Sequence, residues 1–474
     1  MDIKLFNIII ATDKNGGIGY KNNLPWKFSK DLIYFKSLTS YHSIFQSLNN
    51  YNNILIMGKN TWLSIQSQSQ ELLYRDKYVI TNNYIEYNTH NYKNTKFFKD
   101  FNTCYLAACE NKYSDIWVIG GRQIYNIAFK HWACNKVYFT LINGNFLVDT
   151  SIDLSKYNIK WNNQLTIRDI NKNTLIEYDL IFYEGNLIHN IEAQYLMTLY
   201  DILLNGEKRL SRNGYTLSKF HKVFIYNLQD GFPLLTTKKM FWRGIVEELL
   251  FFIRGDTDTK KLSNKNIKIW NLNTNKEFLN KMNLNYDEGQ MGPMYGYQWR
   301  FFNKPFNTET KLNSGIDQLK NIINDIINDP MSRRLLMTDF NPEQVNQGVL
   351  YPCHSIIIQF YIQQNTLNLS MYQRSGDMFL GVPFNIASTA LLLHIIASIT
   401  NLVPGIINLI LGDYHIYEEH INATNIQLAR IPYTLSKLKM KHFKDLDEVE
   451  NATIEDFELE NYQFHDAIKT FMIA

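Results

Sequence analysis

The sequence predicts an α/β domain over residues 1–185, with a mostly parallel central sheet and flanking helices, followed by an α+β domain over residues 186–474. A chain of 474 residues is too long for one ordinary domain. Short apolar runs alternate with helix-like segments in the first part, whereas long apolar helices and strands of the antiparallel type follow. Glu184-Gly185-Asn186 marks the break between the two patterns.

The strands of the first domain are predicted from short apolar or β-branched runs, with Tyr178–Tyr183 as a candidate last strand. These runs are Leu5–Ala11, Asn53–Met57, Lys77–Thr81, Ile116–Ile119 and Lys136–Leu141. Helical patterns lie between them, at Lys30–Leu38 and Gln123–Phe129. The polar segments Thr39–Asn53 and Gln66–Leu73 are expected to be loops. In the second domain, a helix over Gln194–Leu204 and a strand over Leu335–Asp339 are expected.

Composition and charge narrow the class of protein. The 48 basic and 45 acidic residues nearly cancel, so nucleic acid is an unlikely partner. The longest apolar runs lie around Ala390–Ile399 and Ile406–Leu411. A helix needs about 20 apolar residues to span a bilayer, so these runs are too short and no membrane association is expected. No signal peptide pattern and no paired cysteine spacing are visible, which predicts a cytoplasmic protein with no metal site. Cys104, Cys109 and Cys134 are expected to be buried apolar residues.

A carboxylate and three glycine-containing turns mark a candidate site in the first domain. Asp31 and Phe35 share one helix face, although an isolated Asp in a first helical turn is usually a surface residue. Ala11 and Gly16-Gly17-Ile18-Gly19 follow the first strand, and Gly58-Lys59 opens a helix after another, as expected for a phosphate site. Gly120-Gly121 follows a later strand in the same way.

In this order, these features resemble dihydrofolate reductase. The resemblance implies that Asp31 orients the pterin ring and favours its protonation, with Thr140 supporting it, and that Arg75 holds the α-carboxylate of the folate tail. It implies a pterin cavity lined by Leu32, Phe35 and Ile65, and NADPH as cofactor. The residues implied around NADPH are Ala11, Gly17, Ile18, Gly19, Gly58, Lys59, Asn60, Thr61, Thr81, Asn82, Gly120, Gly121, Arg122, Gln123, Ile124 and Tyr125.

The second domain groups a cysteine with anion-binding residues. Cys353-His354 is followed by Gln373-Arg374-Ser375-Gly376-Asp377 and then Asn385. A lone cysteine is more often a core thiol, but a nucleophilic thiolate needs electropositive neighbours that lower its pKa, and a phosphate needs arginines. The adjacent Arg333 and Arg334 would be an ordinary solvated charge pair elsewhere; between a Pro-marked turn and a strand they can present a fork to phosphate.

Residues 189–474 resemble thymidylate synthase. Three stretches carry the resemblance besides the cysteine region: Phe232–Lys239, Gly292–Arg300 and Gly381–Ser388. The resemblance implies that Cys353 adds to dUMP, that Glu248 relays protons with Tyr295 and His354, and that 5,10-methylenetetrahydrofolate is the co-substrate. It implies dUMP contacts from Arg212, Arg333, Arg334, Arg374, Ser375, Gly376, Asp377, Asn385, His415 and Tyr417, and folate contacts from Trp270 and Asp377. Met472-Ile473-Ala474 would close over the folate, and Arg333 and Arg334 would come from the partner subunit of a homodimer.

Several positions depart from the two family patterns. Tyr351 stands for a usual proline before the cysteine, and Phe340-Asn341 for Trp-Asn. The segment Gln66–Leu73 lacks a usual Pro and Arg, Tyr414 and Glu418-Glu419 alter the surroundings of His415, and the loop at Arg212 is one residue short. None of these changes removes a chemical group that either reaction needs.

Both halves in one chain resemble the bifunctional dihydrofolate reductase–thymidylate synthase of protozoa. Two alternatives from other classes stay open at this point. In one, the reductase half is only a scaffold for a working synthase; in the other, the chain is a non-catalytic RNA-binding regulator, against which the near-neutral charge speaks. The joint presence of Asp31, Glu248, Cys353 and Asn385 favours an enzyme with two sites.

Overall fold

The computed structural model describes residues 4–40, 52–67, 72, 75–111, 114–187, 191–306 and 315–472. It consists of two compact units. The first unit comprises Met1–Met197 and Leu428–Pro432, and the second comprises Thr198–Gln427 and Tyr433–Ala474.

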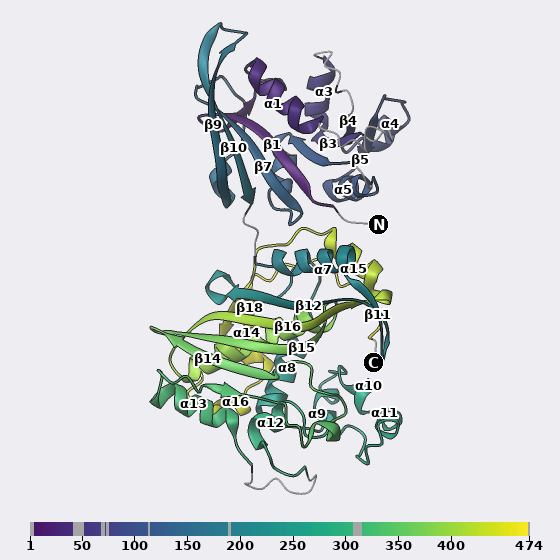
Figure 1. Cartoon of the computed structure of the whole chain (residues 1–474), viewed down its shortest axis with the longest axis vertical. Helices are drawn as coiled ribbons and strands as arrows, with labels where there is room; N and C mark the ends of the chain where they lie inside the picture. The colour runs from purple at the N-terminus through teal and green to yellow at the C-terminus, as the bar shows by residue number, and fades with distance from the viewer. Residues whose placement is uncertain are drawn as a thin grey trace. The chain divides into compact units, whose positions relative to one another are not determined.

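The first unit is built around an eight-stranded sheet with the order β5-β4-β3-β6-β1-β7-β10-β9 (Figure 1). Neighbouring strands from β5 to β7 run parallel, and β10 is antiparallel to both β7 and β9. The predicted α/β domain with a mostly parallel sheet is therefore confirmed. The strands are β1 (Phe6–Asp13), β3 (Asn53–Gly58), β4 (Arg75–Ile80), β5 (Thr95–Phe98), β6 (Ile116–Gly120), β7 (Cys134–Ile142), β9 (Ile159–Asn171) and β10 (Ile176–Leu187).

Short helices join these strands. The side chain of Asp100 caps α5 by accepting a hydrogen bond from the Thr103 backbone N–H. One core cluster joins the strand residues Leu55 and Trp117 to Trp62, which lies on the helix that follows β3. The remaining elements are β2 (Gly17–Gly19), α1 (Ser29–Thr39), α3 (Lys59–Ser67), α4 (Tyr84–Asn88), α5 (Phe101–Cys109), α6 (Arg122–Ala128), β8 (Thr150–Ser151) and η1 (Leu154–Lys156).

The second unit contains a six-stranded sheet with the order β11-β12-β16-β15-β14-β13. The β15 and β16 strands are parallel and the other neighbours are antiparallel, as Figure 1 shows for β12, β16, β15 and β14. The strands are β11 (Glu207–Ser211), β12 (Gly214–Asn227), β13 (Leu336–Met337), β14 (Ile357–Gln363), β15 (Thr366–Asp377) and β16 (Val403–Tyr417), with β17 (Lys437–Met440) and β18 (Phe457–Glu460) pairing separately. The strand expected over Leu335–Asp339 is shorter than predicted.

Helices of very different length complete the second unit. The longer ones are α7 (Ala193–Asn205), α8 (Trp242–Ile253), α13 (Gln318–Asn328), α14 (Gly381–Ile399) and α15 (Ile421–Leu428). The shorter ones are α9 (Lys260–Ser263), α10 (Asn271–Thr274), α11 (Lys276–Lys281), α12 (Gly296–Phe301) and α16 (Leu446–Glu450), with single turns η2 (Leu228–Asp230), η3 (Val345–Gln347), η4 (Glu418–His420) and η5 (Ile454–Asp456). This mixture of helices and a mixed sheet is the predicted α+β class.

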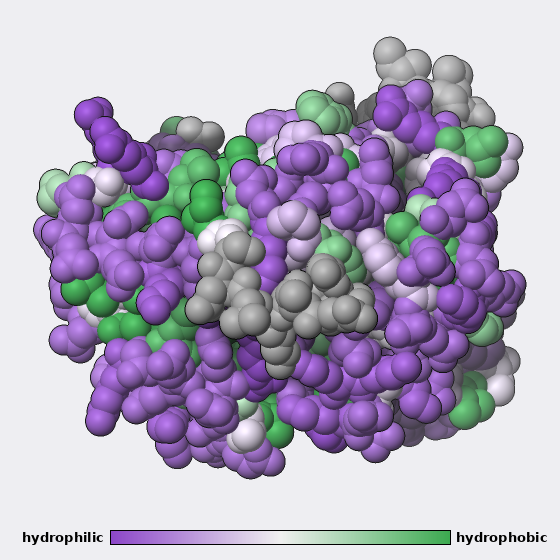
Figure 2. Space-filling model, turned by 90° about the horizontal axis from the view of Figure 1, so that it is seen from below, coloured by the Kyte–Doolittle hydropathy of each residue, from purple (hydrophilic) through white to green (hydrophobic). Residues whose placement is uncertain are grey.

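The most apolar helix, α14, lies in the interior. It begins at Gly381, so it is longer than the apolar run that the sequence suggested. Within the described ranges it is the one helix long and apolar enough to cross a bilayer, and 78% of that stretch is buried inside the protein. Its apolar character is therefore explained by the core that it fills. The face of the molecule in Figure 2 is mostly hydrophilic, with hydrophobic patches interspersed.

Candidate active sites

The first site is assembled from the carboxyl ends of parallel strands. Ala11 lies near the end of β1, Gly58 ends β3, Thr81 follows β4 and Gly120 ends β6. Thr140 lies near the end of β7 and pairs with Ala11 across the sheet. Ligands of open α/β sheets bind at this edge, because the loops that follow adjacent strands meet there. Residues predicted from five separate segments are thus brought to one edge.

Asp31 is the acidic group of this site. It lies in the first turn of α1, and burial raises the pKa of its carboxyl to about 6. A hydrogen bond with Thr140 of β7 offsets part of this shift, whereas the charge of Asp169 adds to it. The carboxyl therefore changes its protonation state close to neutral pH, which suits a group that assists protonation of a ligand.

Arg75 is tied to the same helix. It is buried at the start of β4, and its Nη1 donates a hydrogen bond to Oγ1 of Thr39 at 3.0 Å. The guanidinium lies 5.8 Å from the ring centre of Phe35, and burial lowers its pKa. Phe35 and Ile65 pack against one core cluster, so the predicted apolar lining and the predicted tail-binding arginine are neighbours.

The glycine turns after β3 and β6 fit a dinucleotide. A Cβ on Gly121 would lie 3.3 Å from Oγ1 of Thr61, so the two turns approach closely where no side chain intervenes. Gly120 has φ +123°, and a Cβ there would lie 3.1 Å from the ring of Tyr125. Helix α3 begins directly at Lys59 and offers backbone N–H groups and a cation to phosphate. These residues could hold NADPH, which supplies hydride when bound.

The β1–β2 loop is held by Asp13. Its Oδ1 accepts hydrogen bonds from the backbone N–H groups of Asn15 (2.9 Å) and Gly17 (2.7 Å). Ile18 and Gly19 continue into β2, which pairs with β8. The predicted loop beside the nicotinamide therefore has a fixed shape. Asn60, Asn82, Arg122 and Gln123 are exposed, and Ile124 is buried behind Gly58.

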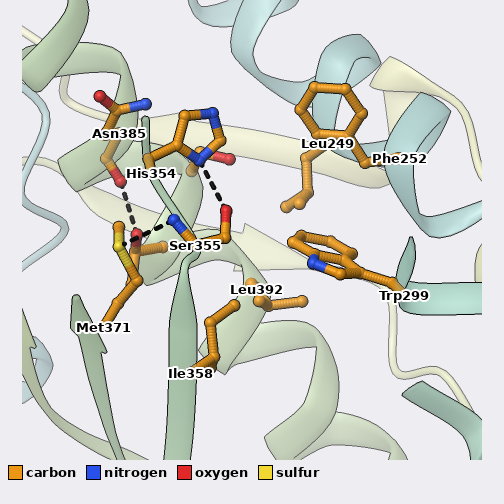
Figure 3. Close-up of a pocket in the computed structure, with 11 residues that line it drawn as sticks. Leu249, Phe252, Trp299, His354, Ser355, Ile358, Met371, Asn385 and Leu392 are labelled. Atoms are coloured by element: carbon orange, nitrogen blue, oxygen red, sulfur yellow. Dashed lines mark hydrogen bonds between the residues drawn. The ribbon is translucent and has the colours of Figure 1, made fainter. Parts of the chain in front are cut away.

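In the second unit, Cys353 lies in the segment between β13 and β14. Its Sγ is 3.4 Å from Oη of Tyr295, and that oxygen also accepts a hydrogen bond from the Cys353 backbone N–H. The His354 ring stacks on Tyr295 at 4.4 Å. The Nδ1 of His354 lies 2.6 Å from Oγ of Ser355 (Figure 3). The predicted nucleophile and two of its predicted partners are therefore in contact.

The electrostatics of Cys353 differ from the sequence-based expectation. The positive charge of Arg374 and a hydrogen bond with Tyr295 lower the pKa of the thiol, as expected. Burial raises it by more, and the carboxyl of Asp339 raises it further. The net direction is a raised pKa, because desolvation outweighs the one nearby cation.

Glu248 is poised to exchange protons. It lies on α8, where burial raises the pKa of its carboxyl to about 7. Nε1 of Trp270 donates a hydrogen bond to its Oε1 at 2.8 Å, which offsets part of the shift. Burial lowers the pKa of His354 to about 4, so this imidazole is neutral at neutral pH.

Asn385 is oriented by a neighbouring amide. Nε2 of Gln373 donates a hydrogen bond to its Oδ1 at 3.0 Å, which directs the Asn385 NH₂ group elsewhere. Asn385, His354 and Ser355 line a small cavity that is partly open to solvent (Figure 3). Nearby, Nδ1 of His415 is 2.6 Å from Oδ1 of Asp413, and the Tyr417 ring is 5.2 Å from the His415 ring. Asp377 pairs with His415 across β15 and β16, beside Ser375 and Gly376 of the same strand.

The arginines expected at the phosphate are not all brought to Cys353. Arg374 lies close to Cys353 in space, since its backbone N–H donates a hydrogen bond to the Cys353 carbonyl at 2.8 Å. Arg212 lies in the turn between β11 and β12. Arg333 and Arg334 are exposed before β13, and within the described ranges neither side chain forms a hydrogen bond or ion pair with the Cys353 group.

One buried group was missed from the sequence. Asp339 is 1% exposed, and among the described residues neither carboxylate oxygen has a hydrogen bond of normal geometry. Burial raises its pKa well above the ordinary value, and the proximity of Ser355 offsets only part of this. The available signal was a carboxylate at the end of an apolar run, which was read as a strand end. Of the predicted C-terminal closure, Ile473 and Ala474 lie outside the described residues, as does most of Gln66–Leu73.

Known families and relatives match the two units in order. The family model for dihydrofolate reductase matches residues 5–184, and that for thymidylate synthase matches residues 193–474. The bifunctional dihydrofolate reductase-thymidylate synthase of Paramecium tetraurelia is 36% identical and covers 99% of both chains. That of Plasmodium berghei is 33% identical over 97% of this chain and 94% of the relative. A thymidylate synthase of equine herpesvirus 2 is 43% identical over 60% of this chain and 98% of its own.

These matches extend over nearly the whole chain, in the order reductase then synthase. The chain belongs to the family of bifunctional dihydrofolate reductase–thymidylate synthases.

Proposed function

We propose that the chain catalyses two linked reactions at the two sites described above. The synthase converts dUMP and 5,10-methylenetetrahydrofolate into dTMP and dihydrofolate, and the reductase returns dihydrofolate to tetrahydrofolate with NADPH. The observation that carries this proposal is that each unit contains a titratable carboxyl with a pKa near neutrality, Asp31 at about 6 and Glu248 at about 7, beside its other predicted active-site groups.

At the reductase site, Asp31 binds and orients the pterin. Its carboxyl hydrogen-bonds the pterin ring and favours the protonated ring that accepts hydride, while Thr140 holds the carboxyl in place. Arg75 pairs with the folate carboxylate, and its bond to Thr39 fixes the guanidinium relative to the helix that carries Asp31. The N-terminus of α3 and the turn at Gly120-Gly121 hold NADPH.

At the synthase site, the Cys353 thiolate adds to C6 of the pyrimidine and makes C5 nucleophilic toward the one-carbon unit of the folate. Arg374 and the partner's arginine pair hold the phosphate. Asn385 hydrogen-bonds the uracil edge, because Gln373 orients its amide. Glu248, with Tyr295 and the neutral His354, moves protons to and from the ring.

We further propose a homodimer formed by the exposed face of the second sheet. Ile357, Tyr372, Ile410 and Val223 are directly paired across β14, β15, β16 and β12 and form one apolar row. Along β14 the alternate side chains Ile358, Phe360 and Ile362 are buried, so Ile357 lies on the opposite face, 42% exposed. A contiguous apolar row on an open sheet face suits a self-complementary interface. This pairing would also give the exposed Arg333 and Arg334 an anionic ligand in the other subunit.

The remaining assignments are the domain boundary and the compartment. We place the boundary between the two domains at residues 185 and 186, close to the end of β10 at Leu187 and before α7 begins at Ala193; the two compact units divide later, after Met197. A reducing, cytoplasmic setting is supported by the four cysteines, which are all free thiols although Cys104, Cys109 and Cys134 are buried.

A coupled assay tests both sites. Purified protein is given NADPH and methylenetetrahydrofolate, and NADPH oxidation is followed with and without dUMP. We expect oxidation only when dUMP is present, because the synthase must first produce dihydrofolate. The Cys353→Ala variant should lose this oxidation by about 10³-fold or more, yet should oxidise NADPH at the normal rate when dihydrofolate is supplied.

Two results would contradict the proposal. If dTMP forms while NADPH is not consumed, the reductase half is a scaffold. If Cys353→Ala abolishes oxidation even with added dihydrofolate, the two sites are not separate.

A further inference from the structure

The aromatic side chain of Tyr351, two residues before Cys353, contacts the side chain of Arg374 on β15. The Arg374 guanidinium lies 5.0 Å from the ring centre of Tyr351. Nε of Arg374 donates a hydrogen bond to the Pro352 carbonyl at 3.1 Å, and Nη2 donates to the Tyr351 carbonyl at 3.3 Å. Two backbone carbonyls and a ring face therefore hold one guanidinium.

The groups that hold the Arg374 guanidinium are themselves fixed in place. Tyr351 precedes a proline, which restricts its backbone to extended conformations and so fixes the direction of its carbonyl. Pro352 is buried, and the Tyr351 ring packs against Phe340 at 5.7 Å. These are two of the positions at which the sequence departs from the synthase pattern, and the structure places them in contact.

The guanidinium keeps donors for a ligand. It carries five N–H groups. Within the described residues the two bonds to Tyr351 and Pro352 are its only side-chain hydrogen bonds, so three N–H groups are left. Arg374 is also exposed, so an anion can reach it from solvent. A guanidinium that is already fixed loses less side-chain entropy when it binds a phosphate.

We propose that Tyr351 is a positioning residue for nucleotide recognition: its ring holds Arg374 in the orientation that binds the 5′-phosphate of dUMP. This inference rests on the proposed role of Arg374 at the phosphate. It goes beyond that role because it assigns a function to a side chain outside the predicted set of substrate contacts. Tyr351 acts through Arg374, so its effect is confined to ligands that carry the phosphate.

The test compares dUMP with deoxyuridine, which lacks the phosphate, in Tyr351→Ala and Tyr351→Phe. In Tyr351→Ala we expect KM for dUMP to rise about two- to fivefold, the factor of one surface cation–π contact, with kcat changed less. The inhibition constant of deoxyuridine should stay unchanged. Tyr351→Phe keeps the ring and should restore the wild-type KM. Reductase activity with added dihydrofolate reports whether each variant is folded.

A double-mutant cycle with Arg374→Ala tests the role of Tyr351 separately from that of Arg374. Once Arg374 is removed, Tyr351→Ala should no longer raise KM for dUMP. If Arg374→Ala alone leaves dUMP binding unchanged, the proposed phosphate role of Arg374 is wrong. If Arg374→Ala weakens dUMP binding but Tyr351→Ala does not, only the present inference is overturned. Equal weakening of dUMP and deoxyuridine by Tyr351→Ala would also overturn it, because the ring would then support the Cys353 loop as a whole.

Discussion

Asp31 gives the reductase a specific pH dependence. Its carboxyl has a pKa of about 6, so it is protonated below this pH and ionised above it. Because pterin reduction requires a proton, kcat/KM for dihydrofolate should fall as pH rises through this region. In Asp31→Asn the titrating group is gone. We expect the rate to drop by about 10²-fold and the profile to flatten. Steady-state kinetics on both sides of this pH measures the effect.

The control for this experiment is the other active site. Synthase activity of Asp31→Asn, measured as dTMP formation, should match that of the wild type. An unaltered reductase profile in the variant would remove Asp31 from the proton transfer.

Asp339 should make the second unit less stable as pH rises. Its pKa is raised in the folded state, so the folded protein binds this proton more tightly than the unfolded chain does. Stability from this group is therefore fully present below the unfolded pKa, and is lost as pH increases above it. Asp339→Asn removes the buried carboxylate, and we expect Tm to increase by about 2–4 °C above neutral pH, with a smaller change in acid.

Thermal unfolding at several pH values measures this prediction. Asp329→Asn, at an exposed carboxyl, is the matched control and should leave Tm unchanged. A loss of stability in Asp339→Asn at every pH would instead show that the carboxylate makes a necessary contact.

At the level of elements, the proposed dimer depends on the apolar row across the second sheet. Ile410 of β16 lies in the middle of this row, between Tyr372 of β15 and Val223 of β12. Ile410→Lys would bury an unpaired ammonium group in a self-complementary interface, where each copy meets the other. Sedimentation velocity should then show that the dissociation constant of the dimer is raised by about tenfold or more. Leu175→Lys, at an apolar residue of the first unit that is 81% exposed, is the control and should stay dimeric.

The elements of the first unit differ in how far sequence could predict them. The run Ile116–Ile119 matches β6 closely, because a strand buried between parallel neighbours is a continuous apolar run. The edge strand β9 was missed because Ile159–Asn171 is polar along much of its length. It pairs with a strand on one side only, and that strand is β10. Its pairing is imposed by the hairpin rather than by its own hydrophobic pattern.

The sites show the same division. The residues on the turns after β3 and β6 could be predicted, since glycines at strand ends are visible in the sequence. The contact of Asp31 with Thr140 depends on how α1 lies over β7, which no local pattern encodes; only the family resemblance indicated it. The cation near Cys353 could be predicted from the chain, whereas the burial that raises the pKa of this thiol depends on how the whole unit packs.

For the whole molecule, a dimer with shared sites predicts complementation between two inactive variants. Cys353→Ala lacks the nucleophile, and a chain with both Arg333→Ala and Arg334→Ala lacks the donated arginines. In a mixed dimer, one site combines the intact cysteine of one subunit with the intact arginines of the other. Random exchange of equal amounts should therefore restore about a quarter of the wild-type synthase sites. Formation of dTMP after subunit exchange measures this.

The matched control mixes Cys353→Ala with Glu248→Gln. If Glu248 and Cys353 act within the same subunit, this mixture restores nothing. Recovery in the control, or none in the test mixture, would contradict the shared-site dimer.

The hydrogen bond from the Arg374 backbone N–H to the Cys353 carbonyl has a further consequence for substrate choice. It joins the segment that carries the sulfur to the strand that carries Arg374 through main-chain atoms, in addition to the side-chain bonds of Arg374 to Pro352 and Tyr351. The spacing between the sulfur and the guanidinium that binds the phosphate is thus set by this main-chain bond together with the contacts that hold the Arg374 side chain. The site should therefore select nucleotides by length. A pyrimidine nucleotide whose anionic group lies nearer to the base, or farther from it, than in a 5′-monophosphate should not contact the sulfur and the guanidinium at the same time.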